Sequence, residues 1–322
     1  MIILKKTKLK VKKRVWVFLI LLIFISIGIY SAKKIHQNNL YKATNEYKLL
    51  EIGYTLEEIK ILEQNLEQKK IETLFNNPKN DFLLNLFKEK YYIKINLDRY
   101  IAYEKENNNK TTSEIVTMVN TYNDYKFYDY NIKTDTTKDY LLLVNKFYNL
   151  DELYEPDDLV KISNKYYYGS NHQIRSTVYQ AFIDMWNEAY KENIYLIVNS
   201  SYRDYKTQRE VYDDYKNSQG TTYADAIAAR PGHSEHQTGL SLDIFSKTHT
   251  TTSNFKNSPA HIWLTENAYR FGFIQRYKEN KEHITGFAEE SWHWRYVGVE
   301  AATYMQNNDI TFDEYYAYFL EK

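Results

Sequence analysis

Residues 232–243 read GHSEHQTGLSLD and form the most informative segment of the chain, a dense cluster of polar residues with two histidines and two carboxylates. It places His236 seven residues before Asp243, with a glycine between them that permits a tight bend. Leu242 and Ile244 flank Asp243 in the alternation of a strand that enters a core. A carboxylate between two buried apolar neighbours needs a partner, because an unpaired buried charge is costly. That partner is either a metal ion or an arginine.

A second polar cluster, ESWHWR at residues 290–295, supplies further candidates. Glu290 and His293 stand three residues apart, which is the spacing of one face of a helical turn. Because the chain contains no cysteine, a metal site must use histidine and carboxylate ligands. A catalytic zinc site takes three such ligands and keeps a fourth position for water, with a carboxylate close by to accept the water proton. The following histidines are interpreted as surface or hydrogen-bonded residues: His36, His172, His249, His261 and His283.

Composition and charge exclude several classes of protein. Hydrophobic residues at 43% and aromatic residues at 16% exclude a disordered chain. The formal net charge of zero hides an asymmetry, because residues 1–14 hold seven basic residues and no acidic one. The remainder therefore carries 35 basic against 42 acidic residues, a formal charge of −7. This sign disfavours a nucleic-acid partner, which is bound through its phosphates.

The amino terminus predicts a membrane location. Residues 15–32 read VWVFLILLIFISIGIYSA, 18 residues without a charge, which is just enough for a helix to span about 30 Å of hydrocarbon. The basic segment 1–14 is expected to stay cytoplasmic, so that everything after the span is extracellular. We interpret the span as a retained single-pass transmembrane anchor in the cell membrane. A cleaved signal peptide is the alternative.

Residues 33–138 are predicted to form a mainly helical spacer or stalk domain. A capping box at 55–58 begins one helix, and further helices are expected at 80–90, 97–106 and 113–120. No residue of this segment suggests chemistry. Recruitment of a protein partner by these helices is the alternative role.

In residues 139–322 short apolar strand-like runs alternate with helices and loops. This order predicts a single α+β catalytic domain with a small antiparallel sheet flanked by helices. Residues 141–144 and 194–198 are expected to form short buried strands, and residues 205–216 a helix. A capping box at 311–314 is expected to begin the final helix. One helical face carries the apolar side chains of Val178, Phe182, Met185, Trp186 and Ala189.

Two segments carry a resemblance to a known family. SEHQTGLSLD at 234–243 closely resembles the SxHxxGxAxD signature of the zinc D-alanyl-D-alanine carboxypeptidases of the VanY type, which are related to the VanX dipeptidases and to the L,D-carboxypeptidases. ESWHWRYVG at 290–298 resembles their second signature, usually EPWHWRYVG. Ser241 replaces alanine and Ser291 replaces proline. Both residues are small and neither supplies a ligand, so we expect little effect.

Three further segments extend the resemblance. SSYR at 200–203, with Gln208, resembles the family's SxYR…Q segment. Residues 142–146 and 156–160 resemble the usual start of the domain. The resemblance covers residues 139–322, a little over half of the chain, and its motifs stand in the expected order.

The resemblance implies a set of catalytic residues. His236, Asp243 and His293 are expected to bind Zn²⁺, with water in the fourth position. Glu290 is expected to act as the general base and then as the acid that protonates the leaving amine. Arg203 is the expected cation at the substrate, where it would stabilise the oxyanion or hold a carboxylate. Manganese or cobalt could occupy the same site in vitro.

Three further residues resemble family positions that contact the substrate. Gln208, Ser234 and Tyr277 are therefore predicted to bind it, whereas His233 is left out of the ligand set because its side chain should point away from that of His236. The expected substrate of an outward-facing, membrane-tethered enzyme of this type is the stem peptide of peptidoglycan. Removal of the C-terminal D-alanine is the main interpretation, and cleavage of tetrapeptide stems by an L,D-carboxypeptidase is the close alternative. A non-catalytic module that binds cell-wall peptide is the third.

Overall fold

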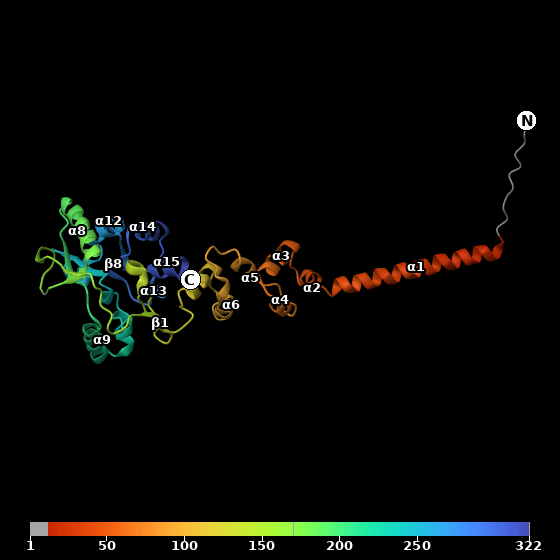
Figure 1. Ribbon diagram of the computed structural model, residues 1–322, viewed down its shortest axis with the longest axis horizontal. Helices are drawn as coiled ribbons and strands as arrows, with labels where there is room; N and C mark the ends of the chain where they lie inside the picture. Colours follow the sequence, from red (N-terminus) through yellow and green to blue (C-terminus); the bar gives the residue numbers. More distant parts are fainter. Residues whose placement is uncertain (1–11, 170, 322) are drawn as a thin grey trace, which may run out of the picture. The chain divides into compact units, whose positions relative to one another are not determined.

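The computed structural model describes residues 12–169 and 171–321. Figure 1 shows the order of the helices and strands along the chain. Contacts divide the described chain into two compact units, one that ends at Lys94 and one that begins at Ile95. The predicted cytoplasmic segment, residues 1–14, lies outside the described residues except for its last three.

The first unit begins with a long apolar helix, α1 (Lys13–Lys42). Its 30 residues include an 18-residue window with a mean hydropathy of 2.5, and none of that window is buried. By length and composition the helix can cross a membrane, and a signal sequence has the same properties. The structure therefore supports the coarser prediction, an amino-terminal membrane anchor or signal sequence.

Four short helices complete this unit: α2 (Asn45–Glu51), α3 (Leu56–Asn65), α4 (Gln68–Leu74) and α5 (Asp81–Leu86). The capping box at the start of α3 is present as predicted, because Thr55 and Glu58 each accept a hydrogen bond from the other's backbone N–H. Apolar side chains of these helices are buried, including Leu49, Ile59, Leu62, Ile71 and Leu84. The mainly helical character predicted for this region is confirmed.

Two more helices, α6 (Leu97–Glu106) and α7 (Thr112–Asn120), match the helices predicted at 97–106 and 113–120. They are contained in the second unit, although they fall within the predicted spacer, residues 33–138. The carboxy-terminal helix α15 (Phe312–Phe319) contacts α7, and the hydroxyls of Thr117 and Tyr318 lie 2.8 Å apart.

The second unit is organised around a four-stranded antiparallel sheet with the order β5-β6-β8-β7. Its strands are β5 (Leu196–Ser200), β6 (Ser241–Ser246), β7 (Phe273–Tyr277) and β8 (Glu290–Tyr296). Two small two-stranded sheets pair β1 (Ile132–Lys133) with β2 (Tyr148–Asn149) and β3 (Leu159–Lys161) with β4 (Gln173–Arg175). The other α-helices are α8 (Ser176–Lys191), α9 (Tyr205–Gln219), α10 (Thr221–Ile227), α11 (Thr252–Phe255), α12 (Pro259–Asn267), α13 (Glu282–Thr285) and α14 (Val299–Asn308). Short 3₁₀ helices include η2 (Thr136–Leu141), η4 (Glu235–Thr238) and η5 (Ala268–Phe271). The α+β class with a small antiparallel sheet flanked by helices is confirmed.

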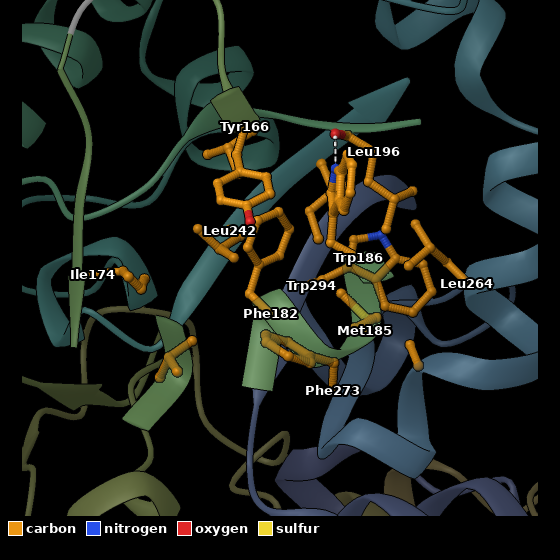
Figure 2. Close-up of a cluster of buried hydrophobic side chains, with 14 of the residues drawn as sticks. Tyr166, Ile174, Phe182, Met185, Trp186, Leu196, Leu242, Leu264, Phe273 and Trp294 are labelled. Atoms are coloured by element: carbon orange, nitrogen blue, oxygen red, sulfur yellow. Dashed lines mark hydrogen bonds between the residues drawn. The ribbon is translucent and has the colours of Figure 1, made fainter. Parts of the chain in front are cut away.

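The main core lies between α8 and one face of this sheet (Figure 2). The apolar face predicted for α8 is buried as expected, with Phe182 and Met185 fully enclosed. Leu242 and Trp294 contribute from neighbouring strands. The indole Nε1 of Trp186 donates a 3.0 Å hydrogen bond to the Leu196 carbonyl, so the buried polar atom of this large side chain is satisfied.

The strand predicted at residues 141–144 is wrong. Leu142 to Val144 are buried as expected, but they follow η2 without forming a strand. Side chains satisfy two of the carbonyls that a sheet would otherwise pair: Arg295 donates to the Leu142 carbonyl at 2.7 Å, and the Thr134 hydroxyl donates to that of Leu143 at 2.8 Å. Tertiary hydrogen bonds have replaced the ladder that the apolar run suggested.

Candidate active site

Two neighbouring strands and a tight turn bring the predicted metal ligands together. The chain leaves η4 through Gly239, which adopts φ +64°, and a Cβ at this position would meet Arg175 Cγ and Leu159 Cδ2 at 3.0 Å. Only glycine fits this turn without strain. It leads His236, on η4, back toward Asp243 on β6, which pairs directly with His293 on β8.

The three side chains each offer one donor atom, and these atoms lie within 4.8 Å of one another. The shortest separations run from Asp243 Oδ1 to His293 Nδ1, at 3.2 Å, and to His236 Nε2, at 3.5 Å. All three residues are buried. Both predicted histidines and the predicted aspartate therefore converge.

The donor set fits a metal ion. Asp243 Oδ1 is buried and accepts no hydrogen bond from any described residue. His236 Nδ1 lies 2.7 Å from the Ser201 carbonyl, so it must carry the proton and donate there, which leaves the lone pair of Nε2 free to face Asp243. An unpaired buried carboxylate oxygen beside imidazole nitrogens is costly without a cation. Two histidines and one carboxylate are the nitrogen and oxygen ligands that catalytic zinc uses.

Glu290 lies in the same cavity as the predicted ligands, but on a strand and not on the predicted helical turn. The prediction of a helical turn is wrong, because residues 290–296 form β8. In a regular strand, residues three apart point to opposite faces. The pairing with β7 shifts register between Gln275 and Tyr277, and this irregularity turns Glu290 back toward His293, with Oε2 3.7 Å from Nδ1.

The carboxyl groups of Glu290 and Asp243 have opposite electrostatic environments. Burial raises the pKa of Glu290 to about 7, partly offset by the charge of His293. Burial alone would also raise the pKa of Asp243, but His236 and His293 hold that pKa well below its usual range. A carboxyl group that titrates near neutral pH can both accept and donate a proton, as general acid–base catalysis requires.

Arg203 and Gln208 act as one unit. The guanidinium Nη1 of Arg203 donates to Gln208 Oε1 at 2.7 Å, and Nη2 donates to Ser200 Oγ at 3.0 Å. The amide of Gln208 in turn donates to the Ala229 carbonyl at 2.7 Å. Gln208 is buried, and its two hydrogen bonds fix the direction of the Arg203 guanidinium.

The two remaining predicted residues also lie at the site. The backbone N–H of His236 donates to Ser234 Oγ at 3.3 Å, so that Ser234 caps η4. The ring of Tyr277 is buried, with its centroid 5.1 Å from that of His293. The ring of His233 is directed to the Asn145 carbonyl, which lies 2.8 Å from its Nδ1.

All eight predicted site residues line one cavity of about 230 Å³. They are Arg203, Gln208, Ser234, His236, Asp243, Tyr277, Glu290 and His293. Tyr215, Phe245 and Trp292 add aromatic walls. The cavity has room for the end of a peptide beside the candidate metal ligands.

Sequence reasoning missed one buried carboxylate at this site. Glu235 Oε2 lies 3.2 Å from His293 Nε2, while its Oε1 accepts hydrogen bonds from Arg276 and Arg295 at 2.7 and 3.0 Å. The available signal was a glutamate directly before the predicted ligand His236. Its partners come from strands far away in the sequence, so spacing alone could not connect them.

Comparison with known proteins identifies the family of this chain. The family model for VanY, D-alanyl-D-alanine carboxypeptidase, matches residues 171–299. The putative carboxypeptidase YodJ of Bacillus subtilis is 37% identical over 218 residues, which cover 66% of this chain and 80% of that protein. The chain belongs to the VanY family. The structure of the LdcB LD-carboxypeptidase is also similar, with 38% identity, a TM-score of 0.56, and coverage of 60% of this chain and 92% of that one.

A further VanY-family structure is a complex with Zn(II). It is a variant of the vancomycin-resistance D,D-pentapeptidase VanY from a VanB-type cassette, 36% identical, with a TM-score of 0.47 and coverage of 54% of this chain and 97% of that one. Membership of the VanY family confirms the predicted enzyme class, a carboxypeptidase.

Proposed function

We propose that this chain hydrolyses the bond before the C-terminal D-alanine of peptidoglycan stem peptides, with His236, Asp243 and His293 holding Zn²⁺. The convergence of these three donor atoms beside Glu290, in one cavity, carries the proposal. Zinc bound there would lower the pKa of a coordinated water and polarise the scissile carbonyl.

Glu290 moves the protons in this scheme. Its carboxylate accepts a proton as the water oxygen bonds to the carbonyl carbon, and it returns that proton to the amine as the C–N bond breaks. Its position 3.7 Å from a ligand atom of His293, and a pKa raised by burial to about 7, suit both steps.

Arg203 recognises the substrate. Its guanidinium lines the cavity, held by Gln208 and Ser200, where a planar fork can bind a carboxylate or stabilise the oxyanion. Ser234 and Tyr277 complete the binding surface from the neighbouring turn and strand.

An L,D-carboxypeptidase acting on tetrapeptide stems is the second candidate function. The similarity to the LdcB LD-carboxypeptidase, at 38% identity, favours it. The same proposed ligands and the same Glu290 would serve either reaction.

The amino-terminal helix supports a location at the membrane. We propose that residues 15–32 anchor the chain as a single-pass span, residues 33–138 act as a helical spacer, and residues 139–322 form the carboxypeptidase domain outside the cell. The apolar window of α1 and the basic residues that precede it support this orientation. The partner is then the stem peptide of the wall, and the charge of −7 after residue 14 disfavours nucleic acid.

The test uses the full chain purified in mild detergent, with bound zinc quantified. Pentapeptide and tetrapeptide stem fragments are incubated with it separately, and the products are followed by mass spectrometry. Loss of one D-alanine from the pentapeptide is the expected result. Loss from the tetrapeptide alone would support the second candidate, and stoichiometric zinc without cleavage of either peptide would refute both.

A further inference from the structure

Glu235 is a fully enclosed carboxylate that the reaction itself does not use. Its side chain has no exposed surface, and both of its oxygens are engaged. Oε1 accepts hydrogen bonds from Arg276 Nε and Arg295 Nη1, and Oε2 faces His293 Nε2 at 3.2 Å. An ionised carboxylate only accepts hydrogen bonds, so His293 must donate through Nε2.

The two candidate histidine ligands are therefore held in opposite orientations. His236 donates its Nδ1 proton to the Ser201 carbonyl and turns Nε2 toward Asp243. His293 donates through Nε2 to Glu235 and turns Nδ1 toward the same Asp243 oxygen, 3.2 Å away. The proton on the outer nitrogen decides which nitrogen of each ring is free to bind a metal.

We infer that Glu235 is a positioning residue that selects Nδ1 of His293 as a metal-binding atom and locks the orientation of that ring. The inference rests on the proposed function, because it assumes that His236, Asp243 and His293 hold Zn²⁺. Glu235 touches neither substrate nor reacting atoms in this scheme and acts only through His293.

The surrounding charged groups explain why Glu235 holds the His293 ring in one orientation. Arg276 also pairs with Asp313 on α15, with N–O distances of 2.6 and 3.1 Å. Asp313 accepts a further hydrogen bond, at 2.7 Å, from Asn145. Arg295 is anchored by the carbonyls of residues 140 and 142. Glu235 is thus fixed from its far side by groups that have their own partners, so it cannot follow a rotation of the His293 ring.

Two variants and a matched control test the inference. Glu235→Gln keeps the shape but removes the charge, and Glu235→Asp keeps the charge with the arginines but withdraws it from His293. Both should weaken zinc binding 10- to 100-fold, as loss of a partner behind a ligand typically does. Asp313→Asn alters the same buried network through Arg276 but leaves the contact between Glu235 and His293 in place, so it should lower stability and change the zinc dissociation constant much less than either Glu235 variant does.

The measurements are the zinc dissociation constant of the full chain by chelator competition and the nitrogen NMR spectrum of ¹⁵N-histidine-labelled, zinc-loaded protein. In the wild-type spectrum, His293 should be bound through Nδ1 and His236 through Nε2. Binding of His293 through Nε2 would overturn the inference even where a variant fails to fold. Unchanged zinc affinity in both Glu235 variants would overturn the inference about Glu235 and leave the proposed function standing. A wild-type chain that binds no zinc would overturn the proposed function as well.

Discussion

Replacing Glu290 by glutamine should make the protein nearly inactive and, without metal, more stable. The substitution preserves the size of the side chain in the cavity and removes only its ability to ionise. Only 17% of the Glu290 side chain is exposed, and burial raises its pKa from an ordinary 4.5 to about 7. The structure therefore holds this carboxylate in a site that disfavours its charge.

The gain in stability follows from proton linkage. As the pH rises from 4.5 to 7, the unfolded chain releases the Glu290 proton while the folded chain retains it, so the free energy of unfolding falls with pH. A shift of 2.5 pKa units amounts to about 3 kcal/mol once both states are ionised. Glu290→Gln lacks this loss. The free energy of unfolding of the metal-free variant should therefore exceed that of the metal-free wild type by about 3 kcal/mol at pH 8 and by much less at pH 5.

The loss of activity has an independent origin. General acid–base catalysis by a positioned side chain contributes about 10²- to 10⁴-fold to the rate. Removal of the proton carrier should therefore raise the barrier by about 3 to 5 kcal/mol. Zinc content should stay near wild type, because the three proposed ligands are untouched.

Denaturant unfolding in the presence of a chelator measures the first effect. Four of the five tryptophans lie after residue 180, so their fluorescence reports on the second unit. Release of D-alanine by zinc-loaded protein measures the second effect. A stability difference that is the same at pH 5 and pH 8 would refute the electrostatic argument, and a variant with more than a tenth of wild-type activity would refute the role of Glu290.

Four other perturbations test separate parts of the structure. Removal of metal by a chelator should abolish release of D-alanine, and stoichiometric Zn²⁺ should restore it in the mass-spectrometric assay; activity that survives full chelation would contradict a metal mechanism. Arg203→Lys keeps a positive charge but loses the fork that Gln208 orients, so kcat/KM on the pentapeptide should fall at least about tenfold with zinc content unchanged. Phe182→Ala opens a cavity in the core of Figure 2 and should lower the free energy of unfolding by about 3 to 5 kcal/mol; a change below about 1 kcal/mol would contradict tight packing there. Burial lowers the pKa of Lys146 to about 8, so as the pH rises the folded chain releases this proton before the unfolded chain does. Between pH 8 and 10.5 the free energy of unfolding of wild type should therefore rise by up to about 3 kcal/mol relative to that of Lys146→Met. A difference between the two proteins that is independent of pH would contradict this burial.

Local patterns predicted what depends on near neighbours in the sequence. The apolar face of α8 and the capping boxes of α3 and α15 follow from residues within a few positions of one another, and all three are present. His236 and Asp243 were predicted as a pair because the turn between them is short. The wider set of site residues came from resemblance to a family, and the structure brings that set into one cavity.

Features that depend on distant partners could not be predicted in this way. The run Leu141 to Val144 has the apolar character of a strand, but side chains such as Arg295, more than 150 positions away, satisfy its carbonyls instead. The spacing of Glu290 and His293 suggested a helix because a register shift in a strand leaves no local mark. Glu235 escaped notice for the same reason, since its role exists only once two arginines from other strands surround it.

The three buried carboxylates of the site explain one another. Asp243 is held ionised by the two histidines that it faces, and Glu235 is held ionised by two arginines, so burial fails to raise the pKa of either one. Burial raises the pKa of Glu290, and the negative charges of Asp243 and Glu235 add to this rise; together they outweigh the lowering by His293 and Arg203. Two carboxylates are thus fixed as structural charges, and only the third can exchange a proton near neutral pH. This division of environments supports the proposal that Glu290 transfers the protons, independently of its place in a motif.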